Sequence, residues 1–229
     1  MKYPTLEIYK KYLETEKKDW NEQIRRPIKK NILLSMISTH KKLGVDPSPL
    51  VKEILDKNGD IYFWSDQHFF HHNIIKYANR PFQSISEMNQ KMVNNYYEKV
   101  KENDLVFFCG DVAFGEIELT RNLLKGSPGK KVLIMGNHDF DKNKCIFRNY
   151  HLFDAICMGF DFTCNLNSKN VDFIVTHYPI DEKFLPEGVV NIHGHIHQYK
   201  LGVKHFNVSV EHTNYQPLSL NEIISSIDL

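Results

Sequence analysis

The sequence predicts an α/β domain preceded by a helical extension. Five short apolar runs rich in Val, Ile and Phe follow residue 58, and each leads into Asp, His or Asn. Uninterrupted runs of this kind are typical of strands covered on both faces. Helical stretches separate several of them, and alternating strands and helices favour an α/β fold. Asn58 and Gly59 form a turn signal, so we place the domain in residues 59–229.

Composition predicts a soluble, cytoplasmic protein with no membrane partner. The 229 residues are 41% hydrophobic and 25% charged. No apolar run approaches the roughly 20 residues that a membrane helix needs. The first residues are charged and lack the apolar core of a signal peptide. The four cysteines show no CxxC spacing, which predicts reduced thiols rather than a disulfide framework.

Residues 1–58 form the predicted basic extension. They contain 13 Lys or Arg against 8 Asp or Glu, whereas the rest of the chain contains 16 against 20. Three helices are predicted there, over residues 5–24, 28–42 and 50–56. Lysine doublets seven residues apart share a helix face, which suits either a solvated surface or contact with a partner or nucleic acid.

The five predicted strands position the polar residues that follow them. They cover residues 61–64, 105–109, 132–135, 173–175 and 189–192. In an α/β protein, ligands bind beyond the carboxyl ends of the strands. The residues at those ends are Asp66, His68, Asp111, Asn137, His138, Asp139, His177, His193, His195 and His197. We therefore expect them to converge on one pocket.

Helices are predicted between and after the strands. Ser84 and Glu87 have the spacing of a capping box before apolar residues at helical intervals. Residues 116–125 predict another helix, which ends at Gly126. Residues 145–170 have a weaker pattern and predict only further strands or loops. The last predicted elements are a strand and a helix, over residues 206–210 and 218–227.

The polar residues at the strand ends are of types that bind metal ions. Imidazole is the commonest protein metal ligand, and Asn137 offers a neutral oxygen. Asp66 and His68 lie two residues apart, as do His195 and His197, and alternate side chains of an extended segment point to one side. Mixed nitrogen and oxygen ligands suit Mn, Fe or Zn better than Ca or Mg. The pattern favours a metal site over histidines with only structural roles.

Taken in order, these motifs resemble those of the calcineurin-like metallophosphoesterases. They are Asp66-x-His68, Gly110-Asp111, Gly136-Asn137-His138-Asp139, His177 and Gly194-His195-Ile196-His197. The resemblance spans residues 61–227, and residues 66–82 look like the small bacterial and phage branch that lacks a cap. It implies a four-layer sandwich of two mixed β-sheets flanked by helices. Residues 1–58 have no counterpart in the pattern.

The resemblance also implies a role for each residue. Asp66, His68 and His197 would hold one metal ion, Asn137, His177 and His195 a second, and Asp111 both. The implied reaction is phosphate-ester hydrolysis by in-line attack of a hydroxide bridging two divalent ions, Mn²⁺ first and Fe or Zn as alternatives. His138 would protonate the leaving group. Asp139 would either orient His138 or bind a backbone amide.

Four residues are predicted to contact the substrate: Arg80, His71, Asn73 and His193. Arginine can bind a phosphate through two hydrogen bonds, although Arg80 beside a proline also suits a surface salt bridge. His71 and Asn73 directly follow a pair of metal ligands. His193 is left over once the two-metal site is complete, so we expect it to support a ligand or face the substrate.

The substrate is predicted to be a phosphate ester, with a nucleotide or nucleic acid among the candidates. We favour a diester, because no inserted cap closes the pocket. The alternatives are a phosphomonoesterase of the same mechanism, a nuclease directed to nucleic acid by the basic helices, and a binding scaffold without catalysis. The pattern leaves the oligomeric state open.

Overall fold

The computed structural model describes residues 44–114, 117–141, 144–145, 152–166 and 169–227. The helices predicted over residues 5–24 and 28–42 lie outside the described residues. The third predicted helix is α3 (Ser48–Asp56), and its Ile54 is buried in the core of the domain. No helix in the described part of the chain is long and apolar enough to cross a membrane.

The first sheet contains three of the predicted strands side by side. β1 (Ile61–Trp64), β2 (Leu105–Phe108) and β3 (Lys130–Ile134) are parallel. β6 (Ala155–Cys157) continues the sheet in parallel beyond β3, and β11 (Leu218–Ser219) pairs antiparallel with β1. All residues of β1 and β2 are buried, as expected for strands covered on both faces.

The second sheet contains the other two predicted strands. β8 (Lys169–Thr176) and β9 (Val189–His193) are parallel neighbours. β10 (His205–Asn207) pairs in parallel with β9, and β7 (Gly159–Leu166) pairs antiparallel with β8. The stretch without a definite prediction thus supplies β6 and β7. The strand order is β10-β9-β8-β7.

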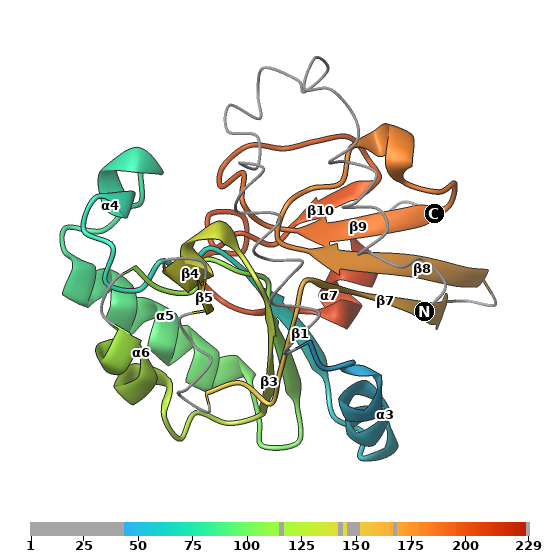
Figure 1. Cartoon of the computed structure of the whole chain (residues 1–229), viewed down its shortest axis with the longest axis horizontal. Helices are drawn as coiled ribbons and strands as arrows, with labels where there is room; N and C mark the ends of the chain where they lie inside the picture. Colours follow the sequence, from blue (N-terminus) through green and yellow to red (C-terminus); the bar gives the residue numbers. More distant parts are fainter. Residues whose placement is uncertain (1–43, 115–116, 142–143, 146–151, 167–168, 228–229) are drawn as a thin grey trace.

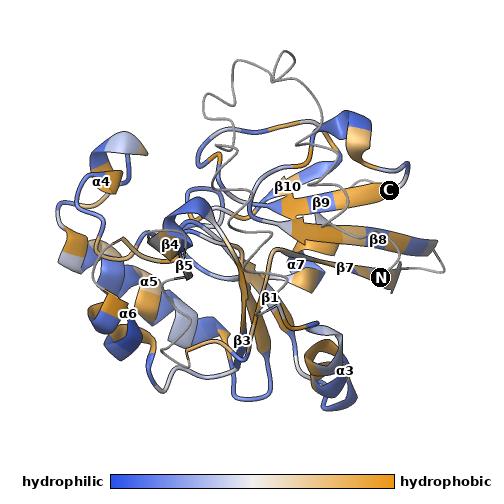
Figure 2. Ribbon diagram, viewed as in Figure 1, coloured by the Kyte–Doolittle hydropathy of each residue, from blue (hydrophilic) through white to orange (hydrophobic). Residues whose placement is uncertain are grey.

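Alternation along the strands of the first sheet builds two apolar cores. Because successive side chains point to opposite faces, Tyr62 and Trp64 pack in one core and Ile61 and Phe63 in the other. The second core also contains side chains of β7, β8 and β9, so it lies between the sheets. Figure 2 shows hydrophobic residues along the strands of both sheets. This inter-sheet core fixes the two sheets relative to each other.

Helices α5 (Ile85–Lys99) and α6 (Ile117–Leu124) cover the face of the first sheet that points away from the second (Figure 1). Ser84 caps α5 as predicted, because the Glu87 amide donates to Ser84 Oγ at 3.1 Å. The reciprocal bond of the predicted capping box is not formed, since the Glu87 carboxylate accepts from the Gln83 amide at 2.8 Å instead of from the Ser84 amide. Gly126 follows α6 with a φ of 76°, a left-handed conformation that glycine adopts without steric cost. The sequence therefore predicted the start of α5 and the end of α6.

The remaining described elements are short. They are α4 (Ile74–Tyr77), the 3-10 helix η2 (Asn137–Asp139), β4 (Phe140–Asp141), β5 (Lys144–Cys145), the 3-10 helix η3 (Glu182–Phe184) and α7 (Leu220–Ser225). The predicted closing helix is thus divided into β11 and α7. Within the described residues, only the segment around η3 packs on the outer face of the second sheet, through Ile180 and Leu185. Two mixed sheets flanked by helices confirm the predicted α/β sandwich.

Candidate metal centre

The carboxyl ends of five strands from both sheets meet at one site. β1, β2 and β3 end there from the first sheet, and β8 and β9 from the second. Six of the predicted ligands form two groups, Asp66 with His68 and His197, and Asp111 with His177 and His195. Within each group the potential ligand atoms lie within 4.8 Å of one another. Convergence from both sheets explains how residues 131 positions apart, such as Asp66 and His197, share one group.

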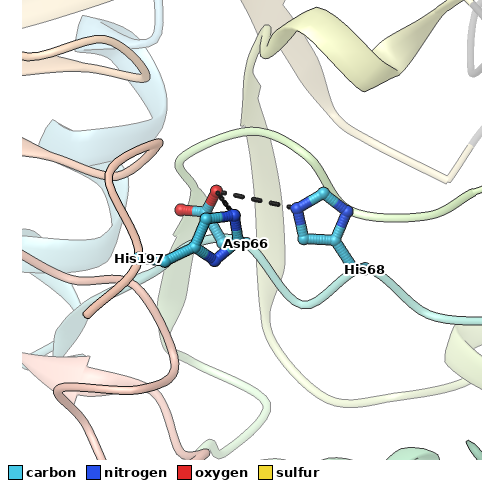
Figure 3. Close-up of side chains that lie close together, drawn as sticks. All are labelled: Asp66, His68 and His197. Atoms are coloured by element: carbon cyan, nitrogen blue, oxygen red, sulfur yellow. Dashed lines mark ion pairs between the residues drawn. The ribbon is translucent and has the colours of Figure 1, made fainter. Parts of the chain in front are cut away.

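The first group is arranged around one oxygen of Asp66 (Figure 3). Asp66 Oδ1 lies 3.8 Å from His68 Nε2 and 3.9 Å from His197 Nε2. These separations are too long for hydrogen bonds, and both Asp66 Oδ1 and His68 Nε2 are buried without a partner. Ligand bonds to a divalent ion are about 2.0–2.2 Å long, so an ion between these atoms fits the spacing. A cation would also satisfy polar atoms that are otherwise costly to bury.

The other oxygen of Asp66 is held by the protein. Asp66 Oδ2 accepts hydrogen bonds from Ser65 Oγ at 2.7 Å, Ser209 Oγ at 2.9 Å and the His195 amide at 2.8 Å. These donors fix the orientation of the carboxylate and leave Oδ1 directed at the two imidazoles. The sequence analysis identified neither serine, although Ser65 directly precedes a predicted ligand.

Asp111 faces both groups. Its Oδ2 lies 3.6 Å from His68 Nε2, and its Oδ1 lies 3.5 Å from His177 Nε2. A carboxylate that presents one oxygen to each group is suited to bridge two cations, as the resemblance implied. Asn137 Oδ1 lies 3.3 Å from His177 Nε2, on the side of the second group. The site therefore offers every ligand type in the predicted set.

Hydrogen bonds and charges prepare His177 and Asp111 for a cation. The Cys109 carbonyl can only accept, so His177 Nδ1 donates to it at 2.8 Å and leaves Nε2 facing the second group. Burial opposes a charge on His177, but the adjacent Asp111 carboxylate raises the pKa of His177 to about 9. Burial disfavours the Asp111 carboxylate, whereas His177 and His138 hold its pKa well below the usual range. A proton or a metal ion can supply the positive charge that this environment favours.

Five of the candidate ligands lie in turns with a left-handed backbone conformation and not in extended chain. Asp66, His68, Asp111, His195 and His197 all have positive φ angles, between 48° and 70°. A non-glycine residue in this region costs of order 1–3 kcal/mol, and such strain is concentrated at functional sites. The sequence analysis expected His195 and His197 to point to one side because they alternate along an extended segment. That explanation is wrong, because β9 ends at His193 and the chain turns after it. His195 and His197 instead belong to different groups.

Two glycines allow the ligand-bearing loops to approach closely. A Cβ atom at Gly194 would collide with the Ser65 hydroxyl and the Asp66 carboxylate. At Gly136 it would collide with the backbone and carboxylate of Asp111. These two glycines of the predicted motifs therefore have a steric role beside a ligand.

The ligands open into a pocket of about 520 Å³. Eight residues singled out from the sequence line it: His68, His71, Asn73, Asp111, Asn137, His138, His195 and His197. The side chain of His138 is 36% exposed, and its Nε2 lies 4.0 Å from Asp111 Oδ2. His138 can therefore contact a molecule bound in the pocket beside the two groups of candidate metal ligands. Burial and nearby His138 lower the pKa of His71 to about 4, so His71 is neutral at pH 7.

His193 and Arg80 lie elsewhere than the substrate-contact prediction expects. His193 is fully buried in β9, and its Nδ1 lies 2.8 Å from the Gly194 carbonyl. Burial lowers the pKa of His193 to about 3, so it is a neutral core residue behind the His195 turn. Arg80 is 4% exposed, and neither residue lines the pocket. These placements correct the predicted substrate contacts of both residues.

Arg80 braces the ligand loop from behind. It donates to the backbone carbonyls of Asp66 at 2.6 Å and Gln67 at 2.9 Å, and it pairs with Glu211 at 2.7 Å. Glu211 Oε1 lies 3.1 Å from His197 Nδ1. Burial disfavours ionised Glu211, but His197 and Arg80 lower its pKa to about 2. Arg80 and Glu211 are thus positioning residues, and no motif in the sequence pointed to Glu211.

Replacing Glu211 with Gln is expected to weaken metal binding. A carboxylate behind a ligating histidine fixes its ring and raises its basicity, and losing such a partner typically costs about 10–100-fold in metal affinity. Titration of the metal-free protein with Mn²⁺, followed by calorimetry, measures the change in Kd. Glu222→Gln is the control, since Glu222 pairs with Lys99 away from the pocket. Equal Kd values for the Glu211→Gln variant and the unmodified protein would show that this contact does not orient His197.

Asp139 holds backbone rather than His138. It is fully buried and accepts from the amides of Gly136 at 2.7 Å, Asp111 at 3.0 Å and Val112 at 3.1 Å. Burial and the Asp111 carboxylate raise the pKa of Asp139 to about 6, so it is ionised at pH 7. Of its two predicted roles, the structure shows the binding of backbone amides. Asp139 thereby ties the loop after β3 to the loop after β2.

The Asp139→Asn variant is expected to lose about 1–2 kcal/mol of unfolding free energy, because its amide makes weaker hydrogen bonds than the carboxylate. Relief of repulsion from Asp111 offsets part of the loss. Urea unfolding of the metal-free protein measures it. Asp46→Asn is the matched control, because Asp46 also accepts a backbone amide, from Ser48 at 2.9 Å, but is exposed. Similar losses in both variants would contradict a special role of the buried carboxylate.

Comparisons with known proteins agree with this site. Residues 71–218 match the family model of the calcineurin-like phosphoesterases. An uncharacterised protein of Methanocaldococcus jannaschii is 34% identical over 178 residues, which cover 73% of this chain and 91% of that protein. The gene 66 protein of Mycobacterium phage L5 is 22% identical over 169 residues, which cover 64% of this chain and 81% of the phage protein.

A solved structure is similar in fold to this chain. The crystal structure of a protein of unknown function from Aquifex aeolicus superposes with a TM-score of 0.58 and 27% sequence identity. The match covers 73% of this chain and 99% of the Aquifex chain. The family model includes the predicted ligands from Asp111 to His197 and begins shortly after Asp66 and His68. This chain belongs to the calcineurin-like phosphoesterase family.

Proposed function

We propose that this protein hydrolyses phosphodiesters with two divalent metal ions, most simply Mn²⁺. The observation that carries the proposal is the position of Asp111, which presents one oxygen to each of two ligand groups beside a pocket. Two bound divalent ions would neutralise phosphate charge and lower the pKa of a water molecule so that it can attack at neutral pH. The residues around them then have separate tasks.

The protein residues would bind the ions, hold the loops and transfer a proton. Asp66, fixed by two serines, would bind the first ion together with His68 and His197. His138 is the proposed proton donor, because it is partly exposed and lines the pocket beside Asp111. Protonation of the departing oxygen by His138 Nε2 avoids release of an alkoxide.

The space around the two groups of candidate metal ligands can accommodate a diester. A diester carries an alcohol on each of two phosphate oxygens, so its site must accommodate two groups. The pocket of about 520 Å³ extends from Asp111 and His138 to Tyr77 and Tyr199, which are exposed residues of two separate segments. A phosphate group alone does not need this volume. The open extension supports a substrate with substituents beyond its phosphate.

Hydrolysis of two matched substrates tests the proposal. The metal-free protein would be loaded in turn with Mn²⁺, Fe²⁺ and Zn²⁺ and assayed with bis(p-nitrophenyl) phosphate and p-nitrophenyl phosphate. We expect metal-dependent release of nitrophenol, with a higher kcat/KM for the diester. A preparation of the Asp111→Asn variant controls for contaminating phosphatases. Inactivity of the fully loaded protein on both substrates would overturn the proposed function, and hydrolysis of the monoester alone would overturn the diester preference.

A further inference from the structure

We propose that the substrate carries a single phosphate and a planar ring, and that Tyr77, Phe114 and Tyr199 bind this ring at the mouth of the pocket. The chemical class is a nucleotide or another phosphate ester with an aromatic group of similar size. This inference rests on the proposed function, since it names the substrate class of the same site. The supporting observations concern the rings, their anchoring and the charge of the pocket.

Exposed aromatic rings are concentrated at this pocket. Within the described residues, four aromatic side chains count among the exposed large hydrophobic residues: Tyr77 at 67%, Tyr97 at 48%, Phe114 at 45% and Tyr199 at 46%. All but Tyr97 line the pocket that contains the candidate ligands. Aromatic rings carry a large apolar area, and leaving several in water at one cavity indicates a ligand that covers them. Stacking on a planar group would do so.

Phe114 is fixed next to the candidate catalytic histidine. Its ring packs edge-on against His71, with centroids 4.2 Å apart, and lies 5.4 Å from the ring of His138. The Phe114 amide donates to the Phe69 carbonyl at 3.0 Å. A ring held here would contact the part of the substrate nearest the leaving group. Phe114 therefore lies between the reacting end of the pocket and the two tyrosines. We call the three residues Tyr77, Phe114 and Tyr199 the aromatic rim of the pocket.

The two tyrosines extend the rim from separate segments. Tyr77 is the last residue of α4, and its ring lies 6.2 Å from that of His71. Tyr199 lies two residues after His197, and its carbonyl accepts from Asn207 Nδ2 at 3.0 Å and from His212 Nε2 at 3.2 Å. The Tyr77 amide donates to the Asn73 carbonyl at 2.9 Å, so hydrogen bonds hold the backbone of both tyrosines. Rings held in place before binding lower the entropy cost of ordering them.

The charge of the pocket limits the number of phosphates. No Lys or Arg occurs among the described residues that line it, and Arg80 is committed to Glu211 and to backbone carbonyls. Each phosphate beyond the one at the metal groups would bring negative charge without a cationic partner. Grooves that bind single-stranded nucleic acid combine aromatic rings with positive charge along the backbone. Aromatic rings without such charge fit a small ester better than a polynucleotide.

Polar groups near the rings can bind the edge of a heterocycle. Asn73 and Gln198 line the same pocket and are exposed. Their amides can each donate and accept hydrogen bonds, which matches the mixed donors and acceptors on the edge of a nucleobase. A plain phenyl group would use the rings but not the amides. The two sources of a planar ring can therefore be told apart by affinity.

Equilibrium binding to the Mn²⁺-loaded protein tests the inference without relying on turnover. The probes are adenosine 5′-monophosphate, phenyl phosphate and ribose 5-phosphate, which are monoesters of the kind that hydrolysis of a diester releases. They share the phosphate and differ in the ring. Base stacking on one aromatic side chain is worth about 1–3 kcal/mol, roughly 5–150-fold in affinity. We expect the nucleotide to bind at least about tenfold more tightly than ribose 5-phosphate, with phenyl phosphate between them.

Variants assign the effect to the rim. Tyr77→Ala and Tyr199→Ala should each weaken nucleotide binding by about tenfold and leave ribose 5-phosphate binding unchanged. Tyr199→Phe keeps the ring and should retain affinity. Tyr97→Ala is the matched control, since Tyr97 is similarly exposed but lies outside the pocket.

Three outcomes would overturn the inference: equal affinity for the nucleotide and ribose 5-phosphate, the same loss for both probes in the alanine variants, or tighter binding of a short oligonucleotide than of the mononucleotide. Failure of the proposed function is a separate result. It would appear as a loaded protein that hydrolyses no ester in any assay, whatever its ranking of the three probes.

Discussion

The Asp111→Asn variant is expected to lose at least about 10³-fold in kcat/KM for a phosphodiester, equivalent to about 4 kcal/mol of transition-state stabilisation. Asp111 lies 3.6 Å from His68 Nε2 through one oxygen and 3.5 Å from His177 Nε2 through the other. An amide offers one oxygen and no charge, so it cannot serve two cations in the same way. Both ligand groups should therefore lose affinity, and metal content per chain should fall together with turnover.

Metal analysis and kinetics on the same preparations separate this effect from unfolding. Inductively coupled plasma mass spectrometry would give metal per chain, and hydrolysis of bis(p-nitrophenyl) phosphate would give kcat/KM. Asp154→Asn serves as control, because Asp154 pairs with Lys130 at the protein surface and does not line the pocket. It should keep its metal content and activity. Two metal ions per chain and undiminished turnover in the Asp111→Asn variant would exclude a bridging role.

Most residues of the candidate metal centre could be predicted, because the positions of strand ends in a sheet can be inferred from the sequence. β1 occupies the predicted residues, Ile61–Trp64. All four residues are buried, as expected for an uninterrupted apolar run in a strand that is covered on both faces. Parallel strands bring their carboxyl ends to one edge of a sheet, so the residues that follow them meet. The N-cap at Ser84 and the glycine after α6 could also be predicted, because each acts on residues close to it in the sequence.

What the sequence could not predict depends on contacts distant along the chain. Arg80 was expected to meet phosphate, but Glu211, which is 131 residues later, pairs with it beneath the loop. Its residue type suggested anion binding, and only the fold shows which anion it meets. His193 follows the same logic. It alternates with two ligands in sequence, yet β9 directs it into the core before the chain turns.

The aromatic rim lacked a signal for a related reason. Tyr77 and Phe114 belong to segments after different strands, and nothing in their spacing connects them. Two other rings beside strand ends, Phe69 and Tyr178, are buried and pack in the core. An aromatic side chain must be exposed to bind a ligand, whereas a buried one contributes to the core. Exposure depends on the tertiary structure, so the sequence alone does not distinguish the two. Motifs thus located the candidate metal centre, whereas the proposed substrate contacts could be identified only from the fold.

Replacing His138 with Ala should lower kcat for an alkyl ester by about 10²–10³-fold and leave metal content unchanged. His138 lies beside both ligand groups but belongs to neither, and its side chain is 36% exposed in the pocket. If it protonates the leaving oxygen, its loss matters most for a poor leaving group. The expected reduction in kcat is therefore large for an alkyl ester and small for the nitrophenyl ester, whose anion leaves without a proton.

Leaving-group dependence distinguishes proton transfer from positioning. A series of diesters with phenol and alcohol leaving groups would be measured with the His138→Ala variant and the unmodified protein, together with metal content. His72→Ala is the matched control, because His72 is an exposed histidine that does not line the pocket. A uniform loss across the series would indicate that His138 positions the phosphate instead. A steeper dependence on leaving-group pKa in the variant assigns the proton to His138, which lines the pocket 4.0 Å from Asp111 and belongs to neither ligand group.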